Sequence, residues 1–128
     1  MSLDNIRLSQ AARDQLVRLK RTTGIKHWNV LCRWALTVSL SDPSTPLVKE
    51  ITTDSNVEMD WDTFAGTQHG HVYLALLKQR CAADGLPLDE KSISRTLTIH
   101  LHRGIGYLAG NKEVRTIREL VDSAVTAK

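Results

Sequence analysis

Blocks of apolar and polar positions along the N-terminal part of the chain predict a short strand followed by two helices. Apolar residues alternate with polar ones over 4–8, which is typical of a strand. Ser9 is a favoured N-cap residue, and helical spacing of apolar side chains follows it over 9–22. Gly24 comes where a helix C-cap glycine is expected. A second helical pattern runs over 26–40, and prolines end it.

A different pattern follows the second helix. Apolar residues alternate with acidic ones over 57–62, which predicts a half-buried strand. We expect residues 48–53 to be its hairpin partner, across the turn-like sequence at 54–56.

The second half of the chain predicts further helices. One covers about 68–83, with Val72, Leu76 and Leu77 facing inward. A long helix over 90–109 carries a continuous apolar stripe and several glycines, which are a cost in a helix interior and mark close helix contact. A short helix over 114–126 completes the pattern. The order strand, helix, glycine turn, helix predicts a mainly α fold, a single domain over 1–128 with a ribbon-helix-helix-like core and a small β-hairpin.

Composition agrees with one globular domain. The chain has 128 residues, of which 41% are hydrophobic and 24% charged. No apolar run is long enough to span a membrane, and no leader-like segment is visible. The two distant cysteines do not make a disulfide framework, so we expect a cytoplasmic protein.

The net charge of +3 is unevenly placed. Residues 1–37 carry seven Lys or Arg and two Asp or Glu, whereas residues 38–64 carry one and six. A basic N-terminal third indicates a polyanion partner, with an ordinary solvated surface as the alternative.

Three sets of residues are candidates for catalysis or metal binding. The two His-x-His pairs, at 69–71 and 100–102, do not share a helix face, so we expect partly exposed helix histidines and no metal site. Glu58, Asp60 and Asp62 share a face of the predicted strand, where they would hold Mg²⁺ or form a solvated edge. We expect Cys32 to be a buried structural thiol. We therefore predict no catalytic residues, no cofactor and no enzyme activity.

The basic residues give a stronger indication of function than these three sets. They lie on the first helix and at its turn, and, as weaker candidates, on the long helix, where they would neutralise phosphates without reading bases. In the predicted strand Arg7 would face outward from a ribbon that pairs across a two-fold. The candidate phosphate contacts are Arg7, Arg13, Lys20, Arg21, Lys26, Arg95, His102 and Arg103.

Several strings then resemble one family. The sequences TGIKHWNVLCRWALTVSL (23–40), TFAG (63–66), LLKQR (76–80) and HLHRGIGYLAG (100–110) are similar to the DndE family of bacterial DNA phosphorothioation systems. The resemblance covers nearly the whole chain, and its motifs contain rare residues.

The resemblance implies a role and partners. DndE-like proteins are similar to ribbon-helix-helix proteins, form homo-tetramers and bind nicked duplex DNA without catalysing a reaction. Their partners are a cysteine desulfurase, a sulfur-transfer protein and an SMC-like ATPase. Motif positions include Gly24, Trp28, Arg33 and Trp34, of which we interpret the two tryptophans as packing or oligomer contacts. Arg33 is either a phosphate contact or an intersubunit ion-pair partner.

Three hypotheses follow for function. The first is a DNA-binding accessory protein of the phosphorothioation system. The alternatives are a Mg-dependent nickase that uses the three carboxylates, and a protein-only scaffold for the sulfur-transfer complex.

Overall fold

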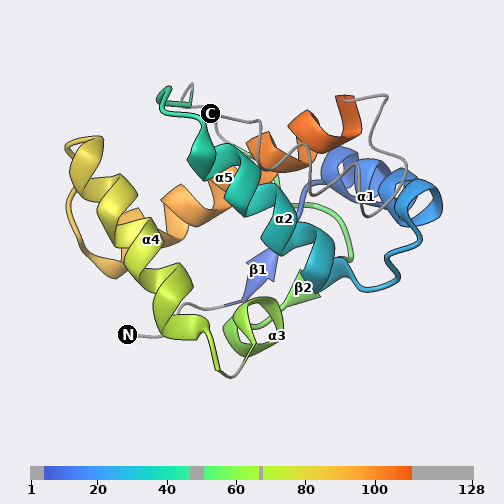
Figure 1. The fold of residues 1–128 in the computed structure, drawn as a ribbon, viewed down its shortest axis with the longest axis horizontal. Helices are drawn as coiled ribbons and strands as arrows, with labels where there is room; N and C mark the ends of the chain where they lie inside the picture. Colours follow the sequence, from blue (N-terminus) through green and yellow to red (C-terminus); the bar gives the residue numbers. More distant parts are fainter. Residues whose placement is uncertain (1–4, 47–50, 67, 111–128) are drawn as a thin grey trace.

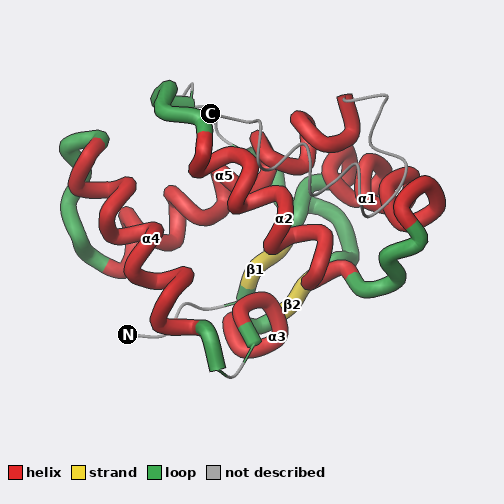
Figure 2. The backbone as a smooth tube through the Cα atoms, in the orientation of Figure 1, coloured by secondary structure: helices red, strands yellow, loops and turns green. Residues whose placement is uncertain are grey.

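The structure is a computed structural model that describes residues 5–46, 51–66 and 68–110. It is mainly helical, with a small two-stranded sheet under the helices (Figures 1 and 2). The element order is β1 (Ile6–Arg7), α1 (Gln10–Thr23), α2 (Trp28–Ser41), β2 (Glu58–Met59), α3 (Trp61–Ala65), α4 (Gly70–Ala83) and α5 (Glu90–Gly110). The mainly α prediction is thus confirmed. The helix predicted over 114–126 lies outside the described residues.

Local signals set the ends of α1 as predicted. The Ser9 side chain accepts a hydrogen bond from the backbone N–H of Ala12 at 3.1 Å. At the other end Gly24 adopts φ +76°, and its N–H donates to the carbonyl of Lys20. A left-handed residue there suits glycine, and it turns the chain sharply into α2.

The long helix α5 is the centre of the core and packs against α1, α2 and α4. Its predicted stripe is confirmed, because Ile93, Leu97, Leu101, Ile105 and Leu108 are all buried. Asp89 caps the helix by accepting from the N–H of Ser92 at 2.8 Å. Burial of this stripe against three helices places α5 at the centre of the apolar core.

The closest approach between helices is at Gly104 of α5. A Cβ built there would overlap the carbonyl of Ala35 in α2 and lie 2.9 Å from its Cα. Glycine therefore lets α5 lie directly against the α2 backbone, as its position in the sequence indicated. Gly106 and Gly110, by contrast, have open space around them.

The sheet differs from the predicted hairpin. β2 pairs antiparallel with β1, with Ile6 opposite Met59 and Arg7 opposite Glu58. Residues 51–53 form no strand, and 47–50 lie outside the described part. β1 thus finds its strand partner within its own chain. The predicted strand over 57–62 also ends early, because the Asp60 side chain caps α3 and Trp61 begins that helix.

The predicted inward face of α4 is partly wrong. Leu77 is buried, but Val72 and Leu76 are 45% and 41% exposed. The helix is apolar on more than one side, so the pattern did not identify the side that meets α5. In the described ranges no helix is both long and apolar enough to cross a membrane.

Candidate nucleic-acid interface

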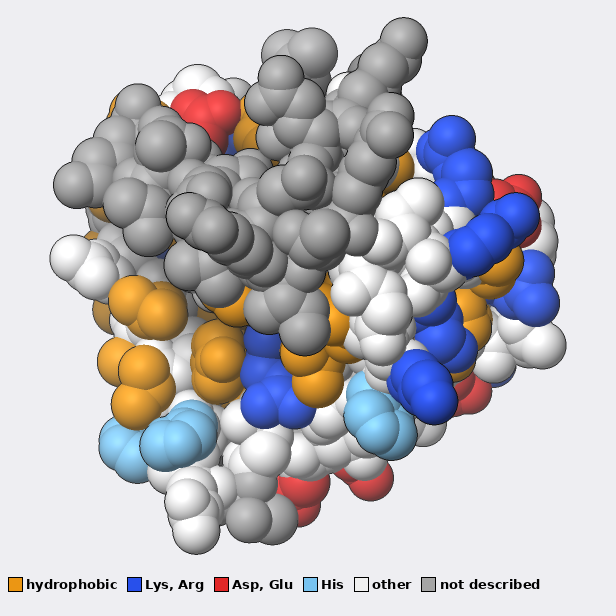
Figure 3. All heavy atoms as spheres, turned by 45° about the vertical axis from the view of Figure 1, so that its right-hand side comes forward, with side chains coloured by type: hydrophobic (Ala, Val, Ile, Leu, Met, Phe, Trp, Pro, Cys, Tyr) orange, Lys and Arg blue, Asp and Glu red, His pale blue; other side chains and the backbone are white. Residues whose placement is uncertain are grey.

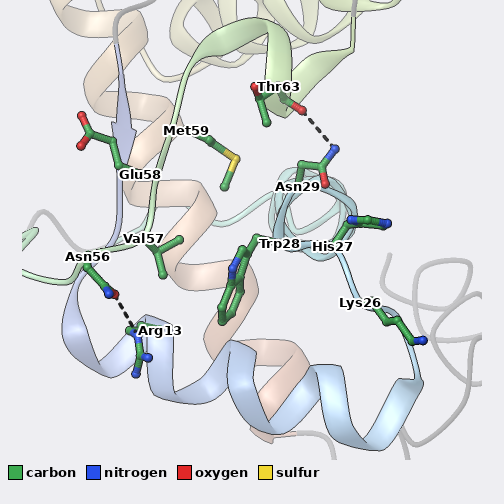
Figure 4. Close-up of a pocket in the computed structure, with 10 residues that line it drawn as sticks. All are labelled: Arg13, Lys26, His27, Trp28, Asn29, Asn56, Val57, Glu58, Met59 and Thr63. Atoms are coloured by element: carbon green, nitrogen blue, oxygen red, sulfur yellow. Dashed lines mark hydrogen bonds between the residues drawn. The ribbon is translucent and has the colours of Figure 1, made fainter.

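A groove lies between α1, the start of α2 and the segment around β2 (Figure 4). Its volume is about 360 Å³. One side carries cationic groups and the floor is apolar. The lining residues are Arg13, Lys26, His27, Trp28, Asn29, Asn56, Val57, Glu58, Met59 and Thr63.

The turn after α1 gives the groove its positive end. Lys26 and His27 are exposed and directly precede Trp28, the first residue of α2. His27 occupies the N-cap position without a side-chain cap bond, so the first N–H groups of α2 lack that partner. The helix dipole adds to the positive potential there.

Trp28 and Lys20 form a unit beside the groove. Lys20 Nζ lies 4.0 Å from the centroid of the Trp28 ring, a cation–π contact. The ring is also half-buried against the core, so the predicted packing role is confirmed. Trp34 likewise packs half-buried against the core. Their predicted role in oligomer contacts stays a prediction.

Two other predicted arginines are partnered at the surface. Arg13 Nε donates to Asn56 Oδ1 at 3.0 Å, which ties α1 to the loop before β2. Arg7 forms an ion pair with Glu58 at 2.9 Å, and Asn5 donates to the same carboxylate. Exposed pairs of this kind are worth at most about 1 kcal/mol, so a phosphate can compete for both guanidinium groups.

The remaining basic candidates separate into two groups. Arg21 is exposed in the last turn of α1, next to the groove's cations. Arg95 is exposed on α5 and does not line the groove. On the face drawn in Figure 3, most of the visible Lys and Arg side chains gather toward the right of the view. Exposed Arg18 of α1 also belongs to the basic helix, although the sequence analysis did not single it out.

Arg103 points into the protein rather than toward a ligand. Its Nε donates to Ser39 Oγ and its Nη2 to the Ser39 carbonyl, both at 2.8 Å. Its Nη1 donates to the Ser44 carbonyl at 3.0 Å. Arg80 of α4 also donates to the Ser44 carbonyl, at 2.7 Å. These two arginines fix the segment that follows α2. Because its donors are used there, Arg103 is not part of the proposed interface.

His102 is occupied in the same way. The backbone N–H of Ser9 donates to its Nε2 at 3.0 Å, and its Nδ1 donates to the Thr98 carbonyl at 2.7 Å. This pattern requires the neutral imidazole, and burial lowers the pKa of His102. A neutral ring whose two nitrogens are both used internally offers no donor to a phosphate, so His102 is not part of the proposed interface either.

His100 corrects the expectation of partly exposed histidines. It is buried, and its Nδ1 lies 2.8 Å from Ser39 Oγ. The same hydroxyl oxygen also accepts from Arg103 Nε at 2.8 Å, so His100, Ser39 and Arg103 form one chain of hydrogen bonds. Burial, assisted by the charges of Arg103 and Arg80, lowers the pKa of His100 to about 4.

Acid should therefore destabilise the protein through His100. An unfolded histidine binds a proton below pH 6.5, whereas the folded one resists it down to about pH 4. Stability is thus complete above pH 6.5 and falls as the pH drops toward 4. We expect a loss of about 2 kcal/mol between pH 7 and 5 in urea unfolding. His100→Gln should lose much less, and exposed His69→Gln should behave like the parent. Equal losses in the parent and His100→Gln would contradict this assignment.

The three carboxylates lie in different settings, and the two thiols are buried. Glu58 pairs with Arg7, Asp60 caps α3, and Asp62 lies within α3, so the predicted shared strand face does not exist. Over residues 5–46, 51–66 and 68–110 no group of three metal-ligating side chains is found. Cys32 is buried as predicted, and burial raises its pKa to about 12.

Residues from distant segments complete the groove. Asn29 Nδ2 donates to the Thr63 carbonyl at 3.1 Å and so joins α2 to α3. Asn56 comes from the loop before β2. Asn29 is a motif position of the family resemblance, but it was not predicted to line a groove. Asn56 was predicted only as part of a turn, because 57–62 was expected to pair with 48–53 and not with β1.

Taken together, these features define a small, mainly helical protein with a cationic groove at one end of its core. A family model described as "DNA sulphur modification protein DndE" matches residues 5–116, and the chain belongs to the DndE family. No curated protein matches the sequence.

Two solved structures share the fold. The crystal structure of DndE from Escherichia coli B7A, involved in DNA phosphorothioation modification, has a TM-score of 0.69 and 24% identity, covering 84% of this chain and 98% of that chain. A DndE mutant with glycine-to-lysine changes, involved in DNA phosphorothioation, has a TM-score of 0.63 and 23% identity, covering 82% and 95%. The α-helical prediction and the family resemblance are thereby confirmed.

Proposed function

We propose that this protein is the DNA-binding accessory protein of a DNA phosphorothioation system. It holds duplex DNA, preferably nicked, through phosphate contacts and catalyses no reaction itself. The observation that carries the proposal is the grouping of Arg13, Lys20 and Lys26 around the groove at the start of α2. Such side chains bind the DNA backbone without reading sequence.

A nick fits this surface in physical terms. Base stacking is interrupted at a strand break, so the duplex bends there at lower cost than an intact duplex. A bent duplex brings phosphates on both sides of the break toward a small basic surface. We propose a homo-oligomer, a tetramer on the family resemblance, which multiplies these contacts. The sulfur-transfer protein, the SMC-like ATPase and the cysteine desulfurase are the proposed partners.

The nickase alternative has less support. It requires Glu58, Asp60 and Asp62 to converge on one ion. Glu58 is instead paired with Arg7, and the Asp60 side chain caps α3. The scaffold alternative differs from our proposal in predicting no DNA affinity, so one experiment separates them.

The test is a gel-shift titration of the purified protein against intact and singly nicked duplexes of one sequence. We expect tighter binding to the nicked duplex and weaker binding to both as salt rises from 50 to 200 mM. With four to six phosphate contacts the affinity should fall by about 100- to 1000-fold over that range. Absence of binding to either duplex at 50 mM salt would reject the DNA-holding role and leave the scaffold reading.

A further inference from the structure

A second hollow lies between α2 and α4, and it shares no lining residue with the groove. Its volume is about 300 Å³, and it is lined by Val30, Arg33, Trp34, Thr37 and Tyr73. Arg33 is the one charged residue of these five. A single cation is thus set among aromatic and apolar walls.

The Arg33 guanidinium makes one hydrogen bond to the described residues. Its Nε donates to the Asn29 carbonyl at a long 3.3 Å, and Arg33 forms no ion pair with any residue that the structure describes. Its side chain is half-buried, so water satisfies it less well than on an open surface. A guanidinium has five donors in a planar fork, which matches the two oxygens of a carboxylate.

The outer face of α4 continues the hollow. By helix geometry Leu76 lies between Val72 and Tyr73 around the axis, so the exposed pair adjoins the hollow. The exposed stripe continues through Ala75, Gln79 and Ala82 and carries no charge. Figure 3 shows hydrophobic side chains gathered toward the left of the view, on the side of α4. A helix that is apolar on more than one side is normally covered.

We propose that this surface docks a different protein, which inserts an Asp or Glu side chain, flanked by apolar residues, against Arg33. We call it the Arg33 face, and it comprises the hollow together with Val72 and Leu76. Trp, Tyr and Arg dominate protein-binding hot spots, and all three meet here. The inference does not depend on DNA binding.

The charge of the Arg33 face argues against two other occupants, a DNA backbone and a second copy of this chain. A DNA backbone carries closely spaced charges and needs several cations, but Arg33 is the one cation of this face. A two-fold contact would set this face of one copy against the same face of another, and the hollow contains no acidic residue to meet Arg33. A head-to-tail contact between copies would need an acidic surface elsewhere on the chain, and the peptide selection described below separates that case. A carboxylate on another protein satisfies both the charge and the apolar rim.

The test is selection of a phage-displayed library of helical peptides, with all residues allowed at exposed positions, against the folded protein. Excess duplex DNA is present, so that the groove is occupied. We expect enriched peptides with an acidic residue between apolar ones. Their affinity should fall at least tenfold for Arg33→Gln and for Leu76→Ser, and partly for Arg33→Lys. Arg95→Gln, which removes an exposed arginine elsewhere, should bind them normally.

Several outcomes would overturn the proposal. These are no enrichment, peptides without an acidic residue, or equal binding to Arg33→Gln. Enriched sequences that match the chain's own surface would indicate a second copy. A gel shift weakened by Arg33→Gln, with an unchanged urea midpoint, would make Arg33 a phosphate contact. Because DNA affinity is measured separately, failure of the docking proposal is distinguishable from failure of the DNA-binding proposal.

Discussion

Gly104→Ala should destabilise the protein by about 3–5 kcal/mol, a large share of the roughly 5–15 kcal/mol that holds a domain folded. The added Cβ would occupy the space of the Ala35 carbonyl, so α5 would have to move away from α2. The clash is with main-chain atoms, which cannot change rotamer to make room. Urea unfolding followed by circular dichroism at 222 nm would measure the loss.

Two controls isolate the cause of this effect. Gly106→Ala, two residues further along the same helix, meets open space and should stabilise by about 0.5–1 kcal/mol, because alanine is the better helix former. Ala35→Gly should not rescue Gly104→Ala, since the obstructing atoms are backbone. A Gly104→Ala protein as stable as its parent would show that the two helices do not approach this closely.

Elements with strong local signals were predictable from the sequence. Ser9 marks the start of α1 through a side-chain cap, and Gly24 marks its end through a left-handed turn. Both signals depend on residues only a few positions away. The stripe from Ile93 to Leu108 identified the buried side of α5, because one helix face must meet the core. Even the close approach at Gly104 had a local signal, an interior glycine in a long helix.

Features set by distant segments were not predictable in this way. The partner of β2 is β1, more than fifty residues earlier, and sequence proximity favoured a hairpin instead. The exposure of Val72 and Leu76 also escaped, because an apolar helix gives no preferred direction. His102 and Arg103 were plausible phosphate ligands by residue type, yet tertiary contacts with Ser9 and Ser39 use their donors and acceptors.

The two surface features differ in the partner that their chemistry suits. The groove combines two lining cations, Arg13 and Lys26, with an apolar floor and the carboxylate of Glu58, which is paired with Arg7. The Arg33 face has one cation and an uncharged rim. Under the proposed function, a protein that connects DNA to other proteins needs both kinds of surface. Because the two surfaces share no lining residue, each can be altered without the other.

Lys20→Gln combined with Lys26→Gln should lower duplex affinity by about 30-fold, at about 1 kcal/mol for each lost phosphate contact. The loss should be similar for every DNA sequence, because phosphate contacts carry no base information. The slope of log affinity against log salt should also fall by nearly 2, since each contact releases about one counterion. Gel shifts over a salt series measure both quantities.

The matched control removes the same charge elsewhere. Lys91→Gln combined with Arg95→Gln takes two exposed cations from α5, outside the groove. We expect less than a threefold change in affinity and an unchanged salt slope. If both double variants weaken binding equally, net charge governs affinity, and the groove between α1 and α2 is not the DNA-binding surface. If the groove variant alone loses affinity on nicked and intact duplexes alike, the groove binds the backbone and the preference for a nick arises from DNA bending.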